Sequence, residues 1–178
     1  ERVSIASLGD MVFSGQSVNI KGVNYKLSAI DSIVVVPEIT VQYNGSSATV
    51  NVSKNIQKDV TATVNGADVV ITNNNVSNEC EIVLSGTSSN GSLTYNGSYK
   101  TTFILNGLKL TSTKGSPLNI LCGKRIAMRL TEGTTNSLVD GASGEQKACL
   151  YCKGHLEIEG AGTLNVTGNA KHAIATKD

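Results

Sequence analysis

The 178-residue chain has few aromatic residues and no tryptophan; its five Tyr and two Phe make up 4% of the sequence. This shortage argues against a thick sandwich core with large aromatic anchors and favours a thin interior of stacked aliphatic side chains. No stretch is long and apolar enough to cross a membrane as a helix. The net charge of +1 argues against a dedicated nucleic-acid binder, which needs a concentrated basic surface. His155 and His172 are the only histidines, so no Ser/His/Asp or Cys/His catalytic set can be assembled.

A short motif returns three times in the C-terminal half of the chain. Each copy is a short apolar strand followed by a corner that carries Lys, and the copies are residues 118–124, 148–154 and 172–178. Their alignment makes Cys122, Cys152 and Thr176 equivalent, at spacings of 30 and 24 residues that are typical of solenoids. In the first two copies a second segment follows, in which apolar and polar residues alternate as in a strand with one buried face.

Repeats of this length hold only short strands and turns, so they leave no room for a crossover helix. Each strand must therefore pair with its counterpart in the next repeat, and we expect an all-β fold, a parallel β-helix or β-solenoid. Equivalent side chains then stack about 4.8 Å apart as interior ladders. We expect one such ladder to contain Leu108, Leu138 and Leu164.

Three regions are expected along the chain. Residues 1–37 form a leader with a strand, in which a β-branched run stops at Pro37. Residues 38–67 contain Asn44-Gly45 and Asn65-Gly66 between alternating strands, a strong hairpin signal, and these hairpins would cap the solenoid. Residues 68–178 form the coils, and the last coil is either incomplete or continued in a longer natural domain.

The cysteines of the repeats admit several interpretations. Cys149, Cys152 and His155 have the spacing of a zinc fragment, but residues three apart on a strand point to opposite faces, so the two thiols are not expected to share a metal. Cys122 and Cys152 are expected in one interior ladder, either as free thiols or as a disulfide. Cys149 is expected to face outward and to be the reactive thiol.

Two acidic residues, Glu157 and Glu159, are expected on one outer face. Their separation of roughly 6–7 Å along the strand would permit a glycosidase pair. Stacking is expected to bring Arg129 beside Glu159, however, and an exposed ion pair keeps a carboxylate ionised when a general acid needs a raised pKa. The other acidic residues of the coils are scattered, so the sequence favours a solvated surface ladder over a catalytic centre.

The candidates for ligand binding are aromatic and basic. Rings of Tyr95, Tyr99 and Tyr151 could stack on the faces of sugars. A basic set at successive corners would suit an acidic polysaccharide such as a polyuronate, and its members are Lys124, Arg125, Lys153 and Lys177. Ordinary solvated turns account for the same residues equally well.

Residues 102–112, 148–158 and 171–178 closely resemble bacterial secreted carbohydrate-binding β-helix proteins, in which a strand ending in L-N-G, an A-I-Y-S-K-D-D-L corner and K-H-G-I-x-S-K-D recur. The resemblance covers residues 68–178, and residues 29–33 also look like the N-terminal portion of surface lipoproteins from gut Bacteroidetes. It implies a right-handed parallel β-helix that binds plant-type polysaccharides such as cellulose or polygalacturonate at a bacterial surface or in the periplasm.

The resemblance also implies calcium held by Asp residues at the S-K-D corners. In this chain the paired Asp residues are replaced by Gly154 and His155 and, one repeat earlier, by Lys124 and Arg125, which leaves Asp178 in place. Calcium prefers six to eight oxygen ligands, and these replacements remove carboxylates.

Three functions are consistent with these observations. The first is non-catalytic, extracellular polysaccharide binding at a bacterial cell surface. The second is a structural or cell-adhesion surface protein without a glycan ligand, which the low aromatic content favours. The third is a β-helix polysaccharide lyase or hydrolase, which lacks a clustered acid site here.

Overall fold

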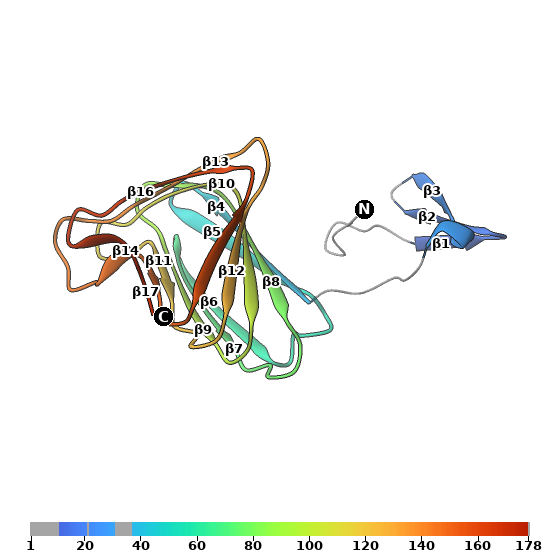
Figure 1. Ribbon diagram of the computed structural model, residues 1–178, viewed down its shortest axis with the longest axis horizontal. Coiled ribbons are helices and arrows are strands. Elements are labelled where there is room, and N and C mark those ends of the chain that lie inside the picture. Colours follow the sequence, from blue (N-terminus) through green and yellow to red (C-terminus); the bar gives the residue numbers. More distant parts are fainter. Residues whose placement is uncertain (1–10, 21, 31–36, 178) are drawn as a thin grey trace.

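The computed structural model describes residues 11–20, 22–30 and 37–177. This part of the chain is composed of strands and turns, with one short 3-10 helix at Leu27–Ala29. It holds no helix of a length and hydropathy suited to spanning a bilayer. The strands form three sheets (Figure 1).

The leader contains a small antiparallel sheet. Strands β1 (Met11–Ser14), β2 (Ser17–Ile20) and β3 (Val23–Lys26) pair in sequence order as two successive hairpins. The β-branched run before Pro37 that was predicted to be a strand lies outside the described residues.

The remaining strands form two larger sheets. The eight-stranded sheet contains β4 (Glu38–Asn44), β5 (Ser47–Val52), β8 (Cys80–Ser88), β10 (Thr101–Thr111), β12 (Ile126–Leu130), β13 (Thr135–Val139), β15 (Leu156–Gly160) and β16 (Thr163–Thr167). The six-stranded sheet contains β6 (Val60–Asn65), β7 (Asp68–Asn73), β9 (Ser92–Gly97), β11 (Leu118–Ile120), β14 (Ala148–Cys152) and β17 (His172–Thr176).

Most strands of these two sheets pair in parallel with their counterparts from neighbouring repeats. In the first sheet β4, β8, β10, β12 and β15 lie side by side in that order, and β13 joins β10 to β16. In the second sheet the order is β7, β9, β11, β14 and β17. The expected parallel pairing between repeats is therefore confirmed, and Figure 1 shows the strands of each sheet next to one another.

Both predicted hairpins are present at one end of this stack. The turns that join β4 to β5 and β6 to β7 place Gly45 and Gly66 at φ +64° and +62°, a conformation that glycine adopts without a steric penalty. In each hairpin one strand, β4 or β7, continues the parallel stack, and the other lies at the sheet edge. The parallel pairing thus extends into the region predicted to be a cap.

The core is made of side chains that repeat from strand to strand. One ladder runs across the eight-stranded sheet through Ile39, Ile82, Phe103, Met128 and Ile158, which are in register. The first four are fully buried, and each such side chain stabilises the fold by roughly 1.5–3 kcal/mol. Ile158 lies on the edge strand β15 and is 44% exposed.

The pairing of β11 with β14 differs from the predicted alignment by two residues. Leu118 lies opposite Leu150 and Ile120 opposite Cys152, so the prediction that Cys122 and Cys152 share a ladder position is wrong. The next pair of strands has the predicted spacing, with Ile126 opposite Leu156. The corner before Ile126 has two residues more than the corner before Leu156, and these two residues absorb the difference.

The predicted ladder of Leu108, Leu138 and Leu164 is wrong by the same amount. Leu138 pairs with Leu110 on one side and with Val166 on the other. A register shift of two residues does not change which face of the sheet a side chain points to, because the alternation has a period of two. Leu108 and Leu138 are therefore buried as expected.

Candidate functional site

A polar hollow lies on the outer face of the six-stranded sheet. Thr94, Asn119 and Tyr151 occupy matching positions on β9, β11 and β14, and they line a volume of about 360 Å³. Ser116 and the loop segment 145–147 complete the lining. The floor of the hollow is therefore built by strands, whose backbone hydrogen bonds fix the spacing of its side chains.

The ring of Tyr151 has a cation above it. Lys147 Nζ lies 5.5 Å from the ring centroid, within the range of a cation–π interaction, which is worth about 0.5–1 kcal/mol at an exposed site. Tyr151 is half-buried and Lys147 is exposed. The sequence identified Tyr151 as a candidate but missed Lys147, because Lys147 precedes the strand and nothing in the repeat pattern indicates that it folds back over the ring.

The loop before Lys147 is fixed by a buried acid. Asp140 is 2% exposed, and its Oδ2 accepts a hydrogen bond of 3.0 Å from Gln146 Nε2. Gln146 Nε2 also donates to the Gly141 carbonyl oxygen, and Asn169 N donates to Asp140 Oδ1. Gln146 Oε1 is buried with no hydrogen-bond partner within the described ranges. This network holds Lys147 beside the hollow, and it could not be predicted from the repeat pattern.

The basic corner, defined here as Lys124, Lys153 and Lys177, continues from the hollow. Lys153 follows Tyr151 by two residues, is exposed, and is the first residue after β14. Cys152 pairs with Thr176, so Lys153 and Lys177 occupy neighbouring positions. All three lysines are exposed, and none has an ion pair in the part of the chain that is described.

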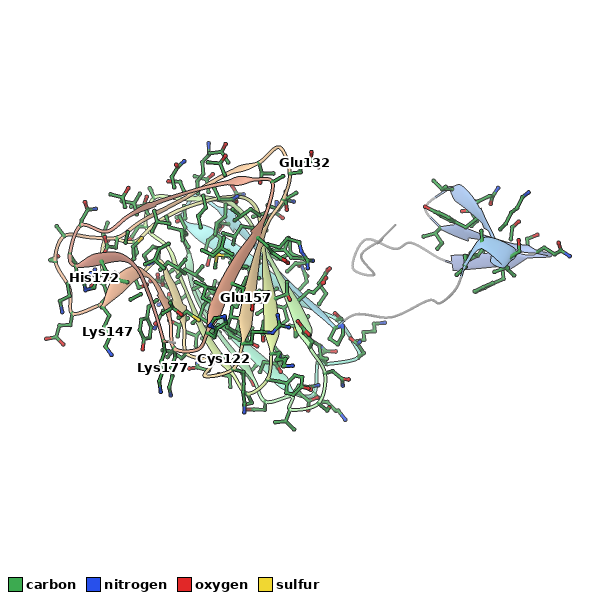
Figure 2. All side chains as sticks on the ribbon, in the orientation of Figure 1. Cys122, Glu132, Lys147, Glu157, His172 and Lys177 are labelled. Atoms are coloured by element: carbon green, nitrogen blue, oxygen red, sulfur yellow. The ribbon has the colours of Figure 1, made fainter. Side chains whose placement is uncertain are left out.

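Figure 2 shows Lys147 and Lys177 projecting from the same end of the molecule, near β14 and β17. Lys124 lies in the longer corner and packs along Gly154, where a Cβ would collide with the Lys124 carbonyl oxygen. Of these cations, Lys147 is the one that contacts the Tyr151 ring, and the three lysines of the basic corner add exposed positive charge near the end of β14.

Arg125 differs from these lysines because it forms an ion pair within the protein. Its Nη1 lies 3.0 Å from Glu157 Oε2 on the neighbouring strand. Binding of an external anion would have to compete with this carboxylate. We therefore separate Arg125 from the basic corner.

Tyr95 is not a surface residue, and its prediction as a ligand-binding residue is wrong. It is 1% exposed, packs edge-to-face on Phe103, and its hydroxyl lies 2.8 Å from Thr101 Oγ1. Strand alternation places Tyr95 on the inner face together with Leu93. Tyr99 is half-buried in the corner after β9, where its carbonyl oxygen accepts a hydrogen bond from Cys122 Sγ.

Cys149 is also buried, and the prediction that it faces outward as the reactive thiol is wrong. Its side chain is 0% exposed, and burial, with a smaller contribution from Asp140, raises its pKa to about 12. All four cysteines of the chain are free and buried. The zinc fragment is not assembled either, because Cys149 and Cys152 lie in the core while His155 is exposed.

The two candidate catalytic carboxylates form ion pairs. Glu159 Oε1 lies 3.0 Å from Arg129 Nη2, as the stacking predicted, and Glu157 is bound by Arg125. Both glutamates are exposed. Each carboxylate is therefore engaged by an arginine of the neighbouring strand and is exposed to solvent, unlike a catalytic acid enclosed in a cleft.

The calcium site implied by the resemblance does not fit the residues of this chain. The corner where the resemblance places acidic side chains holds Lys124 and Arg125 in one repeat and Gly154 and His155 in the next. The described residues contain no group of three His, Cys, Asp or Glu side chains that could hold a metal ion. Asp178 lies outside the described residues.

Residues 65–178 match the model of a family described as carbohydrate-binding domain-containing protein. The match covers more than half of the chain, which therefore belongs to this family. A carbohydrate-binding domain-containing protein of Acetivibrio thermocellus is 26% identical over an alignment of 88 residues, and the match covers 45% of this chain and 31% of that protein.

A solved structure described as a polysaccharide lyase-like protein from C. thermocellum, in a gadolinium derivative, is similar in fold. It has a TM-score of 0.63 and 22% sequence identity, and the alignment covers 81% of this chain and 57% of that one. The chain spans about a third of the curated relative and little more than half of the solved protein.

Proposed function

We propose that this chain is a non-catalytic module that binds an acidic polysaccharide over the outer face of the six-stranded sheet. The observation that carries the proposal is the arrangement around Tyr151, whose ring lies in a polar hollow with Lys147 Nζ 5.5 Å from its centroid. The exposed Lys153 directly follows β14, two residues after Tyr151. Membership of a carbohydrate-binding family supports a glycan ligand.

The chemistry of this face suits a chain of sugar acids. Thr94, Ser116 and Asn119 offer hydroxyl and amide groups that exchange hydrogen bonds with sugar hydroxyls. The exposed lysines supply point charges for carboxylate groups that follow one another along a polyuronate. Because these charges are exposed, their contribution depends on ionic strength and falls off beyond about 8 Å at physiological salt.

The face supports binding better than catalysis. Glu157 and Glu159 are bound to arginines, and Glu145 is the one carboxylate that lines the hollow. A lyase or hydrolase remains the second candidate because the similar solved structure is described as polysaccharide lyase-like. A structural spacer without a glycan ligand is the third.

The architecture we propose is a right-handed parallel β-helix. It is supported by the parallel pairing of successive repeats and by the fold similarity to the lyase-like protein. We place the module outside the cell, at a bacterial surface or in the periplasm, because the leader resembles that of surface lipoproteins from Bacteroidetes.

Affinity electrophoresis through gels that contain polygalacturonate, cellulose or mucin, with and without calcium, tests the proposal. We expect retardation by polygalacturonate that calcium does not require, without new reducing ends or unsaturated products. Retardation accompanied by such products would establish the lyase or hydrolase. A lack of retardation on every glycan would favour the structural role.

A further inference from the structure

We propose that Asn65, the last residue of the edge strand β6, is a site of spontaneous deamidation. In this reaction the backbone nitrogen of Gly66 attacks Cγ of Asn65, the bond from Cγ to the side-chain nitrogen breaks, and ammonia leaves. The resulting succinimide is opened by water to aspartate or isoaspartate. The proposal does not depend on the glycan-binding function.

The turn that contains Asn65 leaves the attacking nitrogen free. Gly66 lies in the two-residue turn between β6 and β7 with φ +62°, and both Asn65 and Gly66 are exposed. Within the described residues, neither the Gly66 N–H nor the Asn65 side chain makes a hydrogen bond. β6 is the outermost strand of its sheet, and Ala48 N of β5 donates a hydrogen bond of 2.9 Å to the Gly66 carbonyl oxygen, so the turn is held at this oxygen and not at the attacking nitrogen. Glycine also presents no side chain that would hinder ring closure.

The two other Asn-Gly turns of the chain are restrained at this same atom. Gly45 follows Asn44, and its N–H donates a hydrogen bond of 2.8 Å to the Thr87 carbonyl oxygen. Gly91 follows Asn90, and its N–H donates at 2.8 Å to the Thr111 carbonyl oxygen. A nitrogen that is held in this way must first break its hydrogen bond before it can attack.

Asn90 is restrained a second time, because its side-chain Oδ1 accepts hydrogen bonds from Thr113 N and Thr113 Oγ1. The pair 96–97 lies within β9, where both residues pair with β7. The pair 106–107 lies within β10 at a point where the register with β8 shifts, and it is not a hairpin turn. Among the three Asn-Gly turns, the one at Asn65 is therefore the turn whose glycine nitrogen has no hydrogen bond within the described residues.

Deamidation would place a new carboxylate in a second hollow of about 330 Å³. Asp68 lines this hollow and pairs with Lys114 at 3.5 Å. The product would lower the net charge of the chain from +1 to zero and put two acids beside one lysine. Isoaspartate would also lengthen the backbone at the end of β6 and break the pairing of Asn65 with Asp68.

Peptide mapping by mass spectrometry after incubation of the folded protein at mildly alkaline pH tests the proposal. We expect conversion at Asn65 at least severalfold faster than at Asn44 or Asn90, and Asn65→Gln should remove the largest share of the released ammonia. In denaturant the five pairs should convert at similar rates. Equal rates in the folded protein, or faster conversion at Asn44 or Asn90, would overturn the proposal.

Discussion

The ammonium group of Lys147 and the ring of Tyr151 lie 5.5 Å apart on the outer face of the six-stranded sheet. The two residues come from different elements, a loop anchored on Asp140 and the strand β14. A ring with one cation above it and Lys153 beyond it can contact a sugar ring and its carboxylate at the same time. Several measurable consequences follow for binding.

Replacing Tyr151 with Ala should weaken retention by polygalacturonate by about tenfold, a loss of ~1.4 kcal/mol. The variant loses the ring that contacts the sugar and the site over which Lys147 is held. Tyr151→Phe keeps the ring and should bind almost as well as the wild type. Tyr99→Ala is the matched control, because this half-buried tyrosine lies at the corner after β9 and does not line the hollow. Equal losses for Tyr99→Ala and Tyr151→Ala would argue against the hollow as the binding site.

The Lys153→Glu variant should be retained less by polygalacturonate than the wild type, and its retention should depend less on salt concentration. Lys153 is exposed, so its attraction for a carboxylate is screened by ions, and the reversed charge repels the ligand. Lys109→Glu on β10 carries the same change of charge on the other sheet and should retain binding. Retention measured at low and high salt distinguishes the two variants, and unchanged retention of Lys153→Glu would remove the basic corner from the site.

Asn136→Ala should destabilise the fold by roughly 1–3 kcal/mol. Asn136 is fully buried, accepts a hydrogen bond of 2.8 Å from Leu108 N, and donates one of 3.1 Å to the Thr163 carbonyl oxygen. Its loss leaves buried backbone groups without partners. Asn165→Ala, on the opposite and exposed face of β16, should change the urea midpoint little. Similar midpoints for both variants would contradict this assignment.

The cysteines should be unreactive in the folded protein and should reduce its stability at high pH. Burial raises the pKa of Cys80 and of Cys149 from 9.0 to about 12, with smaller contributions from Glu81 and Asp140 respectively. The unfolded chain loses these protons first, so stability is unaffected below about pH 9 and falls as the pH rises towards about 12. Urea titrations across this range measure the effect. Rapid labelling of Cys149 by a thiol reagent in native buffer would contradict the buried position.

The double variant Glu157→Gln, Glu159→Gln should be retarded by polygalacturonate as strongly as the wild type. The amount of reducing ends formed from any glycan should be the same for the two proteins. The two carboxylates pair with Arg125 and Arg129 in solvent, where such pairs are worth about 0–1 kcal/mol. Reducing-end assays before and after the substitution measure this. If the wild type produced reducing ends and the variant did not, the surface-ladder interpretation would be wrong.

The repeat pattern predicted the fold to a useful level. Alternation correctly placed Ile120, Leu150 and Cys152 inside and Arg129 beside Glu159, because a face in a strand depends only on odd or even position. The two Asn-Gly hairpins were also predicted correctly. The register between β11 and β14 was not predicted correctly. The corner before Ile126 is two residues longer than the corner before Leu156, and an alignment at a fixed spacing of 30 residues assumes corners of equal length.

The candidate site could be predicted only in part. Tyr151 and the basic corner followed from the repeats, but the anchoring of Lys147 by Asp140 and Gln146 depends on side chains from separate segments. Tyr95 and Cys149 were placed outside for different reasons. Tyr95 was selected because its ring could stack on a sugar, although the alternation along β9 puts it on the buried face. Cys149 has the outward position in the alternation, but it lies near the start of β14 and is buried there.

Hydroxyl-radical footprinting of the protein with and without polygalacturonate tests the central claim most directly, since it locates the ligand on the surface. The account predicts that Tyr151 and the residues beside Lys147 and Lys153 are protected in the complex. The exposed Val64, on the edge strand β6 at the other end of the sheet from β17, should be labelled equally in both samples. Protection confined to the end that carries β5 and β6, with Tyr151 labelled as before, would contradict it.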